Sequence, residues 1–471
     1  MSGNTKFKTR LERWVLIGLT LSILNASLGM SIANVALPTL SEFFQIPIQM
    51  VQWVVLAYLL TVTVTVVSVG RLGDIFGNRK VLLFGILLFI FSSLLCGLST
   101  RFWMLIVARG LQGMGGAALV ALPMALVRDF IPKKRLGLAM GLLGTTSAIG
   151  TMLGPSLGGI LIASFDWPFI FTPLVVIGIL NLVFIYRFLP QTAKSTKFQV
   201  SIFDIRGTLT LMASLICYTL SVTLEKSVLT TEKILLFGGS IIGILLFIRV
   251  EKQVKNPLIN LALFKDRDLT FSLLMNFLIA TVMMSTLIVG PFYLSGALNF
   301  KENTIGLILS IGPFASALSG LPAGKIVDRF GTKNVLVLAL CLMTIAAFAL
   351  AFLPMYFGLT GYVGAIILLT PAYQLFLAAN NTHVMSEAKS SQQGVIAGTL
   401  SLSRNIGLIS GASVMGAIFA MAMAHHADSL ASHSIIHGLK VTYIIAGFMV
   451  SVCLLLAIAT LNIHSGKSQP T

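Results

Sequence analysis

The chain has 471 residues, of which 56% are hydrophobic and 10% are charged, and its mean hydropathy is +0.95. Soluble domains are closer to half apolar and a quarter charged, so this composition excludes an ordinary soluble protein and indicates many membrane crossings. The formal net charge of +17 would also suit a nucleic-acid-binding protein, and the placement of the charge decides between the two. The four cysteines lie in apolar runs without a CxxC pair, which argues against disulfides and zinc.

Fourteen apolar segments have the length of about 20 residues that a membrane-spanning helix needs. The first has no plausible cleavage site and is expected to be retained as a helix. We predict spans at residues 15–37, 50–69, 81–99, 102–125, 137–163, 167–188, 205–225, 233–250, 269–296, 303–324, 335–355, 360–384, 394–421 and 440–462.

The distribution of the basic residues between the two sides of the membrane agrees with fourteen spans. With the N-terminus in the cytoplasm, 25 of the 32 lysines and arginines fall on the inner side. Five fall on the outer side, and Arg109 and Arg404 lie within spans. This asymmetry is the positive-inside pattern of a membrane protein, so the net charge predicts topology and no nucleic-acid partner. We expect a multi-pass protein of the cell (inner) membrane with both termini in the cytoplasm.

A charged stretch occurs twice. Residues 70–83 read GRLGDIFGNRKVLL and residues 324–337 read GKIVDRFGTKNVLV, with six identities in fourteen places. The copies follow spans 2 and 10, so the chain consists of two related halves, as in many transporters, with two spans inserted between them. We therefore predict an all-α polytopic membrane protein with six-helix bundles at 1–190 and 269–471 and inserted helices at 191–268.

Three further stretches accompany this repeat: QWVVLAYLL from Gln52, RGLQGMGGA from Arg109 and GTMLGPSLGG from Gly150. With the charged turn, they resemble motifs of the major facilitator superfamily, and the fourteen spans resemble its drug:proton antiporter branch. The resemblance implies two bundles that alternate around a central cavity, which is lined by the first and fourth helix of each half, here spans 1, 4, 9 and 12.

The first span departs from that branch. Members of the branch usually carry an aspartate there, whereas this chain reads LGMSIANVALP from Leu28, with Gly29 in the place of the aspartate and Ser31 in the place of a threonine. Every Asp and Glu lies in a predicted loop or at a span edge. The membrane interior is therefore expected to hold two arginines and no carboxylate.

Three groups of candidate site residues follow, each with a structural alternative. The arginines are either bonded to backbone carbonyls or are cavity charges that bind an anionic group or modulate proton transfer. The other polar residues either join helices or line the cavity. The charged turns either set topology or form a cytoplasmic latch, and the glycines of span 5 allow close packing around a bend at Pro155. The groups are the cavity residues Asn25, Tyr58, Arg109, Gln112, Asn276, Tyr373, Gln374, Asn380, Asn381 and Arg404; the latch residues Gly70, Asp74, Gly77, Arg79, Lys80, Asp328, Arg329 and Gly331; and the antiporter-motif residues Gly150, Gly154, Pro155, Gly158 and Gly159.

Four histidines, His425, His426, His433 and His437, fall in a predicted outer loop. We interpret them as a solvated loop, with a metal site or pH sensor as the alternative. The sequence contains no GxxxxGK[ST] motif, so the energy for transport must come from a gradient.

These patterns predict a secondary transporter that exports small organic compounds, such as drugs and toxic compounds, by proton antiport. The alternative is an exporter of an anionic or neutral metabolite such as a carboxylate or siderophore. We expect no enzymatic activity, cofactor or metal, and a monomer whose partners are a small-molecule substrate, protons and the lipid bilayer.

Overall fold

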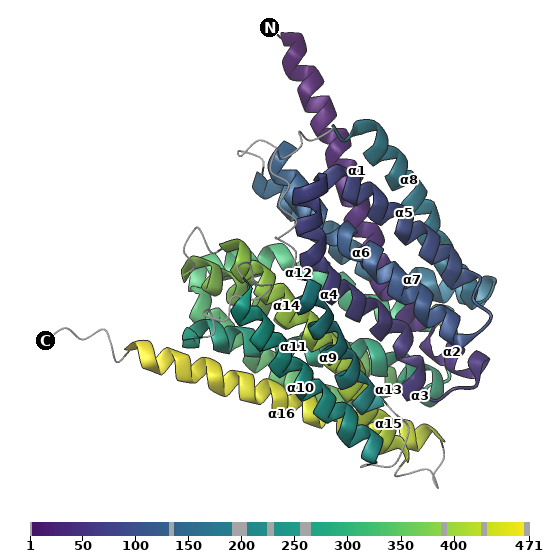
Figure 1. Ribbon diagram of the computed structural model, residues 1–471. Coiled ribbons are helices and arrows are strands. Elements are labelled where there is room, and N and C mark those ends of the chain that lie inside the picture. The colour runs from purple at the N-terminus through teal and green to yellow at the C-terminus, as the bar shows by residue number, and fades with distance from the viewer. Residues whose placement is uncertain are drawn as a thin grey trace, which may run out of the picture. The chain divides into compact units, whose positions relative to one another are not determined.

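The computed structural model describes residues 2–130, 136–190, 205–223, 230–254, 265–387, 393–424 and 431–465. Every regular element in these ranges is a helix, which confirms the predicted all-α fold (Figure 1). Each of the fourteen predicted spans overlaps a described helical segment, and those at 335–355 and 360–384 fall in the same one, Thr332–Glu387. The length of the apolar segments and the polar breaks between them were therefore sufficient to locate the helices.

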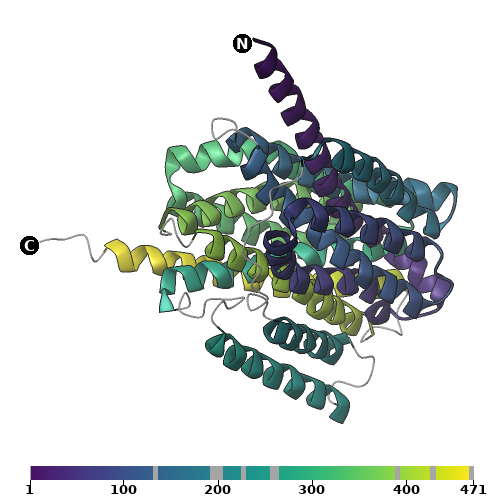
Figure 2. The ribbon, with the colours of Figure 1, turned by 45° about the horizontal axis from the view of Figure 1, so that its top comes forward.

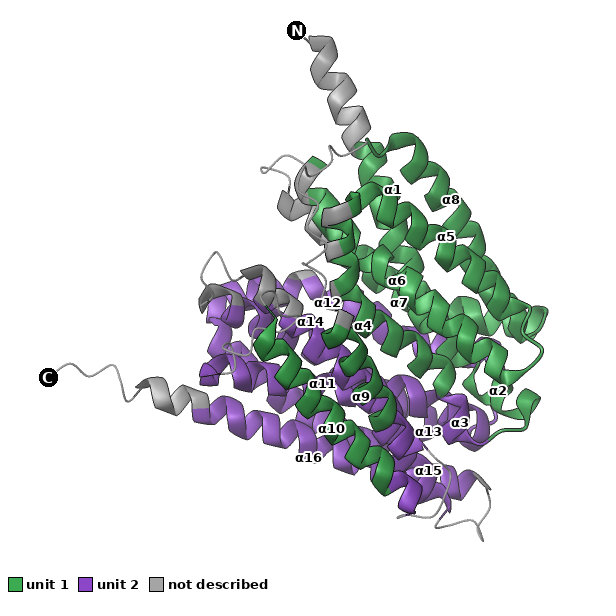
Figure 3. Ribbon diagram, in the orientation of Figure 1, with its two compact units in different colours: residues 1–46, 53–218, 234–258 green, residues 47–52, 219–233, 259–471 purple. Residues whose placement is uncertain are grey.

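The chain forms two compact units (Figure 3). Unit 1 comprises Met1–Ile46, Trp53–Tyr218 and Ile234–Leu258, and unit 2 comprises Pro47–Gln52, Thr219–Lys233 and Ile259–Thr471. The helices in or mainly in unit 1 are α1 (Ser2–Val35), α2 (Leu37–Phe44), α4 (Trp53–Phe76), α5 (Asn78–Gly97), α6 (Phe102–Phe130), α7 (Leu136–Ser164), the 3₁₀ helix η2 (Trp167–Phe171), α8 (Thr172–Phe188), α9 (Ile205–Thr223) and α10 (Thr231–Gln253). Those of unit 2 are α3 (Ile48–Val51), α11 (Arg267–Phe292), the π-helix η5 (Tyr293–Ala297), α12 (Glu302–Phe330), α13 (Thr332–Glu387), α14 (Gln393–Ser410), the π-helix η6 (Gly411–Met415), α15 (Gly416–Ala424) and α16 (Ala431–Ser465).

Twelve segments of the described residues have the length and apolar composition of membrane spans. The longest, Thr332–Val384, contains a kink at Gly358, where φ is 53° and ψ is −126°. Helix α9, at 19 residues, is not among the twelve. The multi-pass architecture is therefore confirmed, whereas the count of fourteen stays a prediction.

Within each unit the helices pack in a corresponding order. In unit 1, α1 packs along α7, and α4 packs along α6. In unit 2, α11 packs along α14 and η6, and α12 packs along α13. The first helix of each half thus lies against the fifth, as two related halves require.

The two inserted helices α9 and α10 run side by side (Figure 2). Ser214 of α9 donates a hydrogen bond of 3.0 Å to the carbonyl oxygen of Ser240 on α10, and both residues are buried. Gly243 faces Ser214 and leaves room for this approach. Apolar side chains of α10 such as Leu235 and Leu245 are exposed, as expected for a helix surrounded by lipid.

The repeated charged stretch is not the loop that we predicted. Helix α4 continues to Phe76 and α5 begins at Asn78, so a single residue, Gly77, separates them. In the second copy Gly331 alone separates α12 from α13. The two glycines have φ of 93° and 81°, a region that other residues rarely adopt. The shared glycine is therefore explained by backbone geometry, because the chain leaves one helix and enters the next within one residue.

We predict that Gly77→Ala and Gly331→Ala each lower the melting temperature of the purified protein, because a side chain at this φ costs about 1–3 kcal/mol. Gly324→Ala is the matched control, since Gly324 lies inside α12 with no atom near its missing Cβ. Thermal unfolding in detergent measures the effect. A melting temperature for Gly77→Ala equal to that of the control would contradict the explanation.

Candidate functional site

The centre of unit 1 contains a fully buried arginine on α6. Arg109 donates hydrogen bonds to two backbone carbonyl oxygens, that of Val54 on α4 at 2.8 Å and that of Gly29 on α1 at 2.9 Å. It also donates to the side-chain oxygen of Gln112, one turn further along α6. A single guanidinium therefore connects three helices.

Aromatic and amide side chains complete this arginine cluster, which we define as Tyr58, Ser93, Arg109 and Gln112. The Tyr58 ring lies 4.6 Å from the guanidinium carbon of Arg109, and its hydroxyl donates a hydrogen bond of 3.0 Å to the carbonyl oxygen of Ala26. Gln112 donates to the hydroxyl of Ser93 on α5 at 2.7 Å. The cluster thus extends to a fourth helix, and cation–π attraction adds to its hydrogen bonds.

The geometry of Arg109 matches the first of the two alternatives, an arginine bonded to backbone carbonyls. Its Nη2 atom is buried and has no partner among the described residues. No carboxylate contributes to the cluster as described, so the charge is stabilised by carbonyl dipoles and a π face. Arginine suits this role because its five donors have a fixed planar geometry, which lysine lacks.

Gly29 of α1 stands at the position where members of the drug:proton antiporter branch usually carry an aspartate. A Cβ atom on Gly29 would lie 2.8 Å from the Phe89 ring of α5 and 3.7 Å from Leu174 of α8. Phe89 is fully buried. The space in which an aspartate would project is therefore occupied by an aromatic ring, while the Gly29 carbonyl accepts from Arg109.

Asn25, one turn before Gly29, bonds elsewhere. Its side-chain amide donates to the carbonyl oxygen of Leu174 at 3.1 Å, and Asn181 donates to Ser22 at 2.8 Å. All three polar side chains, Ser22, Asn25 and Asn181, are fully buried. They join α1 to α8, which is the interhelical role that we weighed against a cavity role.

The candidate residues of unit 2 divide into buried and accessible ones. Asn276 donates to the carbonyl oxygen of Leu400 at 2.8 Å, and Asn380 donates to that of Ser272 at 3.4 Å. Both asparagines are buried and join α11 to its neighbours.

By contrast, Arg404 and Asn381 are exposed, and Tyr373 and Gln374 are partly exposed. Gln374 donates to Ser316 of α12. Arg404 lies on α14, inside the candidate span Thr399–Ala424. Because an arginine within a span must reach water or a partner, the exposed Arg404 is a better anion-binding candidate than the buried Arg109.

The glycines of the antiporter motif face α1. Cβ atoms on Gly150 and Gly158 would lie 2.8 Å and 3.0 Å from backbone carbonyl oxygens of α1, and Gly154 faces Ser31. The Ser31 hydroxyl donates to the carbonyl oxygen of Gly150 at 3.3 Å. Helices α1 and α7 are therefore in backbone contact along three turns.

Unit 2 contains the same arrangement, which the sequence analysis missed. Gly407 and Gly411 face the backbone of α11, and Thr281 donates to the carbonyl oxygen of Gly407 at 3.1 Å. Thr281 takes the part that Ser31 plays in unit 1. The signal was available as glycines four residues apart on span 13, but the flanking sequence does not resemble the motif of span 5.

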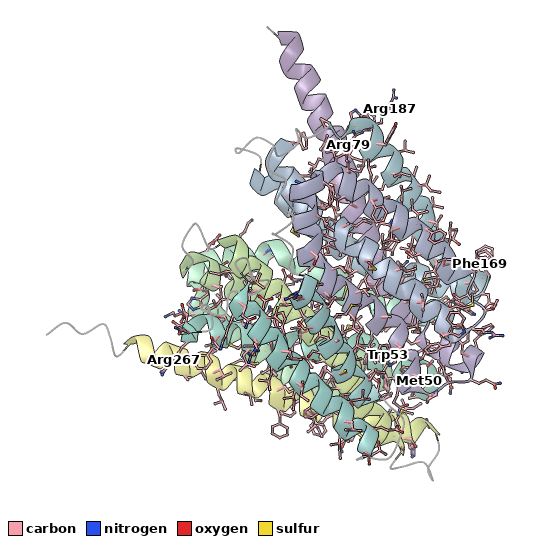
Figure 4. The ribbon with its side chains drawn as sticks, viewed as in Figure 1. Met50, Trp53, Arg79, Phe169, Arg187 and Arg267 are labelled. Atoms are coloured by element: carbon pink, nitrogen blue, oxygen red, sulfur yellow. The ribbon has the colours of Figure 1, made fainter. Side chains whose placement is uncertain are left out.

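The latch residues lie at helix ends. Arg79 donates to the carbonyl oxygen of Tyr186 at 2.7 Å, and Arg79 and Arg187 lie at the same end of unit 1 (Figure 4). This contact satisfies a free carbonyl in the last turn of α8. Lys80, Asp328 and Arg329 are exposed, and the side chain of Asp74 lies outside the described residues. The role of these residues as a latch stays a prediction.

The predicted histidine loop is partly helical, because α16 begins at Ala431 and includes His433 and His437. His425 and His426 lie outside the described residues. Among the residues that are described, no three His, Cys, Asp or Glu side chains gather in a way that could hold a metal ion.

Two copies of one helix packing, in a multi-pass protein, define the class of membrane transporters built from internal repeats. The chain belongs to the Major Facilitator Superfamily, whose sequence model matches residues 19–412. It is 30% identical over 416 residues to the riboflavin transporter RibZ of Clostridioides difficile, covering 88% of this chain and 90% of that one. It is 28% identical over 336 residues to the multidrug transporter protein MdtP of Bacillus subtilis, covering 70% and 61%.

Solved structures show the same fold at low sequence identity. The xylose transporter XylE from E. coli, in a partially occluded inward open conformation, aligns with a TM-score of 0.64 at 14% identity, covering 95% of this chain and 97% of that one. The human organic anion transporter MFSD10 aligns with a TM-score of 0.63 at 16% identity, covering 96% and 99%. The major facilitator fold that the motifs predicted is therefore confirmed.

We predict that Arg109→Ala lowers the free energy of unfolding by about 3–5 kcal/mol, because it leaves two buried carbonyls unpaired and opens a cavity. Arg404→Ala is the matched control, since an exposed side chain contributes within about 0.5 kcal/mol. Thermal denaturation of both purified variants gives the comparison. Equal melting temperatures would exclude the structural role of Arg109.

We also predict that Gly154→Val and Gly411→Val impair folding or transport to a similar degree, because each would separate a helix pair in backbone contact. Gly144→Val and Gly364→Val are the controls, since no atom lies within 4 Å of the missing Cβ at either glycine. Surface expression and transport of the four variants test the equivalence. A wild-type rate for Gly411→Val would show that the packing of unit 2 is not equivalent in function.

Proposed function

We propose that this transporter exports small organic compounds by alternating access, driven by protons. The observation that supports export most directly is the backbone contact of α7 with α1 along Gly150, Gly154 and Gly158, the stretch that resembles the antiporter motif. Relatives named as multidrug transporters, including MdtP, agree with it. The proposed latch residues of the two charged turns would control the inner side of the cycle.

The preferred substrates are neutral or anionic. In the described residues, no carboxylate lies in the central part of a candidate span, and Phe89 occupies the space beside Gly29 where an aspartate would project. Arg404 is an exposed positive charge within a candidate span. A cation would be repelled by this charge, by roughly 4 kcal/mol at 4 Å for an effective dielectric constant of 20.

A neutral or anionic metabolite is the second candidate substrate. The similarity to a riboflavin transporter over 88% of the chain favours it, because that relative is named for a metabolite and not for a drug. A drug exporter and a metabolite exporter would use the same binding site and would differ in how many compounds that site accepts. A panel of substrates separates them: one good substrate indicates a metabolite exporter, and several unrelated ones indicate a drug exporter.

The chain would cross the inner membrane fourteen times. At 1.5 Å per residue the segment Thr332–Val384 would be about 80 Å long, more than twice the roughly 30 Å of the hydrocarbon core, so the kink at Gly358 separates two spans. Helix α9 supplies the remaining one. An even count keeps both termini in the cytoplasm, in agreement with the distribution of basic residues.

Proton coupling requires a titratable group, which arginine is not. The candidates are His383 near the end of α13, Asp74 in the last turn of α4, Glu225, which lies outside the described residues, or an ionisable substrate. Replacing each side chain in turn and measuring proton-driven uptake into inverted vesicles would identify the group. Loss of the pH dependence, rather than of transport itself, is the informative result.

We predict that proteoliposomes with the purified protein export neutral and anionic compounds and transport permanent dications weakly or not at all. Arg404→Ala should reduce anion transport at least tenfold and affect neutral compounds less, because a charge-assisted hydrogen bond is lost. Arg249→Ala is the control, because Arg249 lies on the inserted helix α10. Strong proton-driven export of a dicationic dye, unaffected by Arg404→Ala, would contradict the proposal.

A further inference from the structure

A short segment connects two helices of unit 1 but packs with unit 2. Residues Pro47–Gln52, which include α3, belong to unit 2, whereas the chain before and after them belongs to unit 1 (Figure 3). Helix α3 lies against α15, which follows the π-helix η6. We call Pro47–Gln52 the α3 segment. It is expected on the outer side, because it follows the first span of a chain whose N-terminus is inside.

Gln52 makes the closest contact of this segment. Its side chain is fully buried against Gly416, the first residue of α15. A Cβ atom at position 416 would lie 2.5 Å from Cδ and 2.7 Å from Oε1 of Gln52, closer than non-bonded atoms approach. Gly416 therefore allows the glutamine to pack, and an alanine there would displace it.

The amide of Gln52 is buried without hydrogen bonds. Neither its oxygen nor its nitrogen has a partner among the described residues. Burying an amide without a partner is unfavourable, and water would restore its hydrogen bonds. The packing of Gln52 against Gly416 thus stabilises the contact, and the desolvation of the unpaired amide destabilises it. Such opposing contributions are expected of a contact that opens and closes.

From this geometry we propose that Gln52 and Gly416 form a releasable outer gate contact. In each transport cycle the α3 segment leaves α15, and the unpaired amide keeps the packed state from becoming too stable. Gln52→Leu would make the packed state more stable, because leucine has a similar size and carries no polar group to desolvate. The proposal rests on the alternating access of the proposed function, but its test does not require transport.

The test measures the reactivity of a single cysteine, Val51→Cys, in detergent-purified protein whose four native cysteines are replaced by serine. Val51 is fully buried in the α3 segment, so maleimide reacts only when the segment leaves. We expect Gln52→Leu to slow labelling about fivefold, and we expect Gln52→Ala and Gly416→Ala to accelerate it. The energy of about one hydrogen bond changes the fraction of protein with the α3 segment released by about that factor. Intact-mass spectrometry over time gives the rates.

Two controls isolate the contact. Met50→Cys, at a side chain that is exposed on the same helix, should label at one rate in all variants, and Gly364→Ala should behave as the parent. Size-exclusion chromatography checks that each variant is folded, and Gln52→Asn provides a second, milder change if Gly416→Ala fails. Equal rates in all variants, or faster labelling in Gln52→Leu, would overturn the proposal.

Transport by the same variants separates this inference from the proposed function. Gln52→Leu should reduce the turnover number more than the apparent affinity, because it slows opening and leaves the substrate site intact. If the parent exports none of the panel compounds but the labelling rates change as expected, the proposed function fails and the gate contact stands.

Discussion

The absence of water in the hydrocarbon core is the constraint on which the structure depends. Polar groups there must find partners within the protein, and Arg109 is the most demanding of them. Arg109 donates hydrogen bonds to carbonyl oxygens of α1 and α4, so its charge is stabilised by backbone dipoles and by the Tyr58 ring. The first, second and fourth spans therefore cannot slide past one another without uncovering the charge of Arg109.

The glycine contacts apply the same constraint to packing. Without a hydrophobic effect between helices in lipid, close backbone approach supplies much of the attraction. Both halves use it at the same place, between their first and fifth helices, with Ser31 and Thr281 in equivalent hydrogen bonds. The two halves thus repeat the packing of their first and fifth helices, whereas in the sequence only the charged turn repeats visibly.

The sequence predicted the helices well, because about 20 apolar residues between polar breaks have one stable conformation in a bilayer. It failed at the charged turns, since α4 and α12 continue through them until Gly77 and Gly331. It could not separate structural from accessible polar residues either. Arg109 and Arg404 look alike in the sequence, and only the packing of neighbouring helices shows that one is buried and the other exposed. Likewise the contact of Gln52 with Gly416 joins residues too far apart in the chain for any local pattern.

The proline inside α7 and the π-helix η6 after α14 have a further consequence. If Gly154 and Gly411 are equivalent, Pro155 of unit 1 corresponds to the first residues of the π-helix Gly411–Met415 in unit 2. A proline fixes an irregularity covalently, whereas a π-helix is held only by its surroundings and by a shifted hydrogen-bond register. One substitution at Pro155 therefore removes the proline of the first half, whereas no single residue specifies the π-helix in the second. The two fifth helices therefore differ in mutational robustness, and the second can drift in sequence while keeping its π-helix.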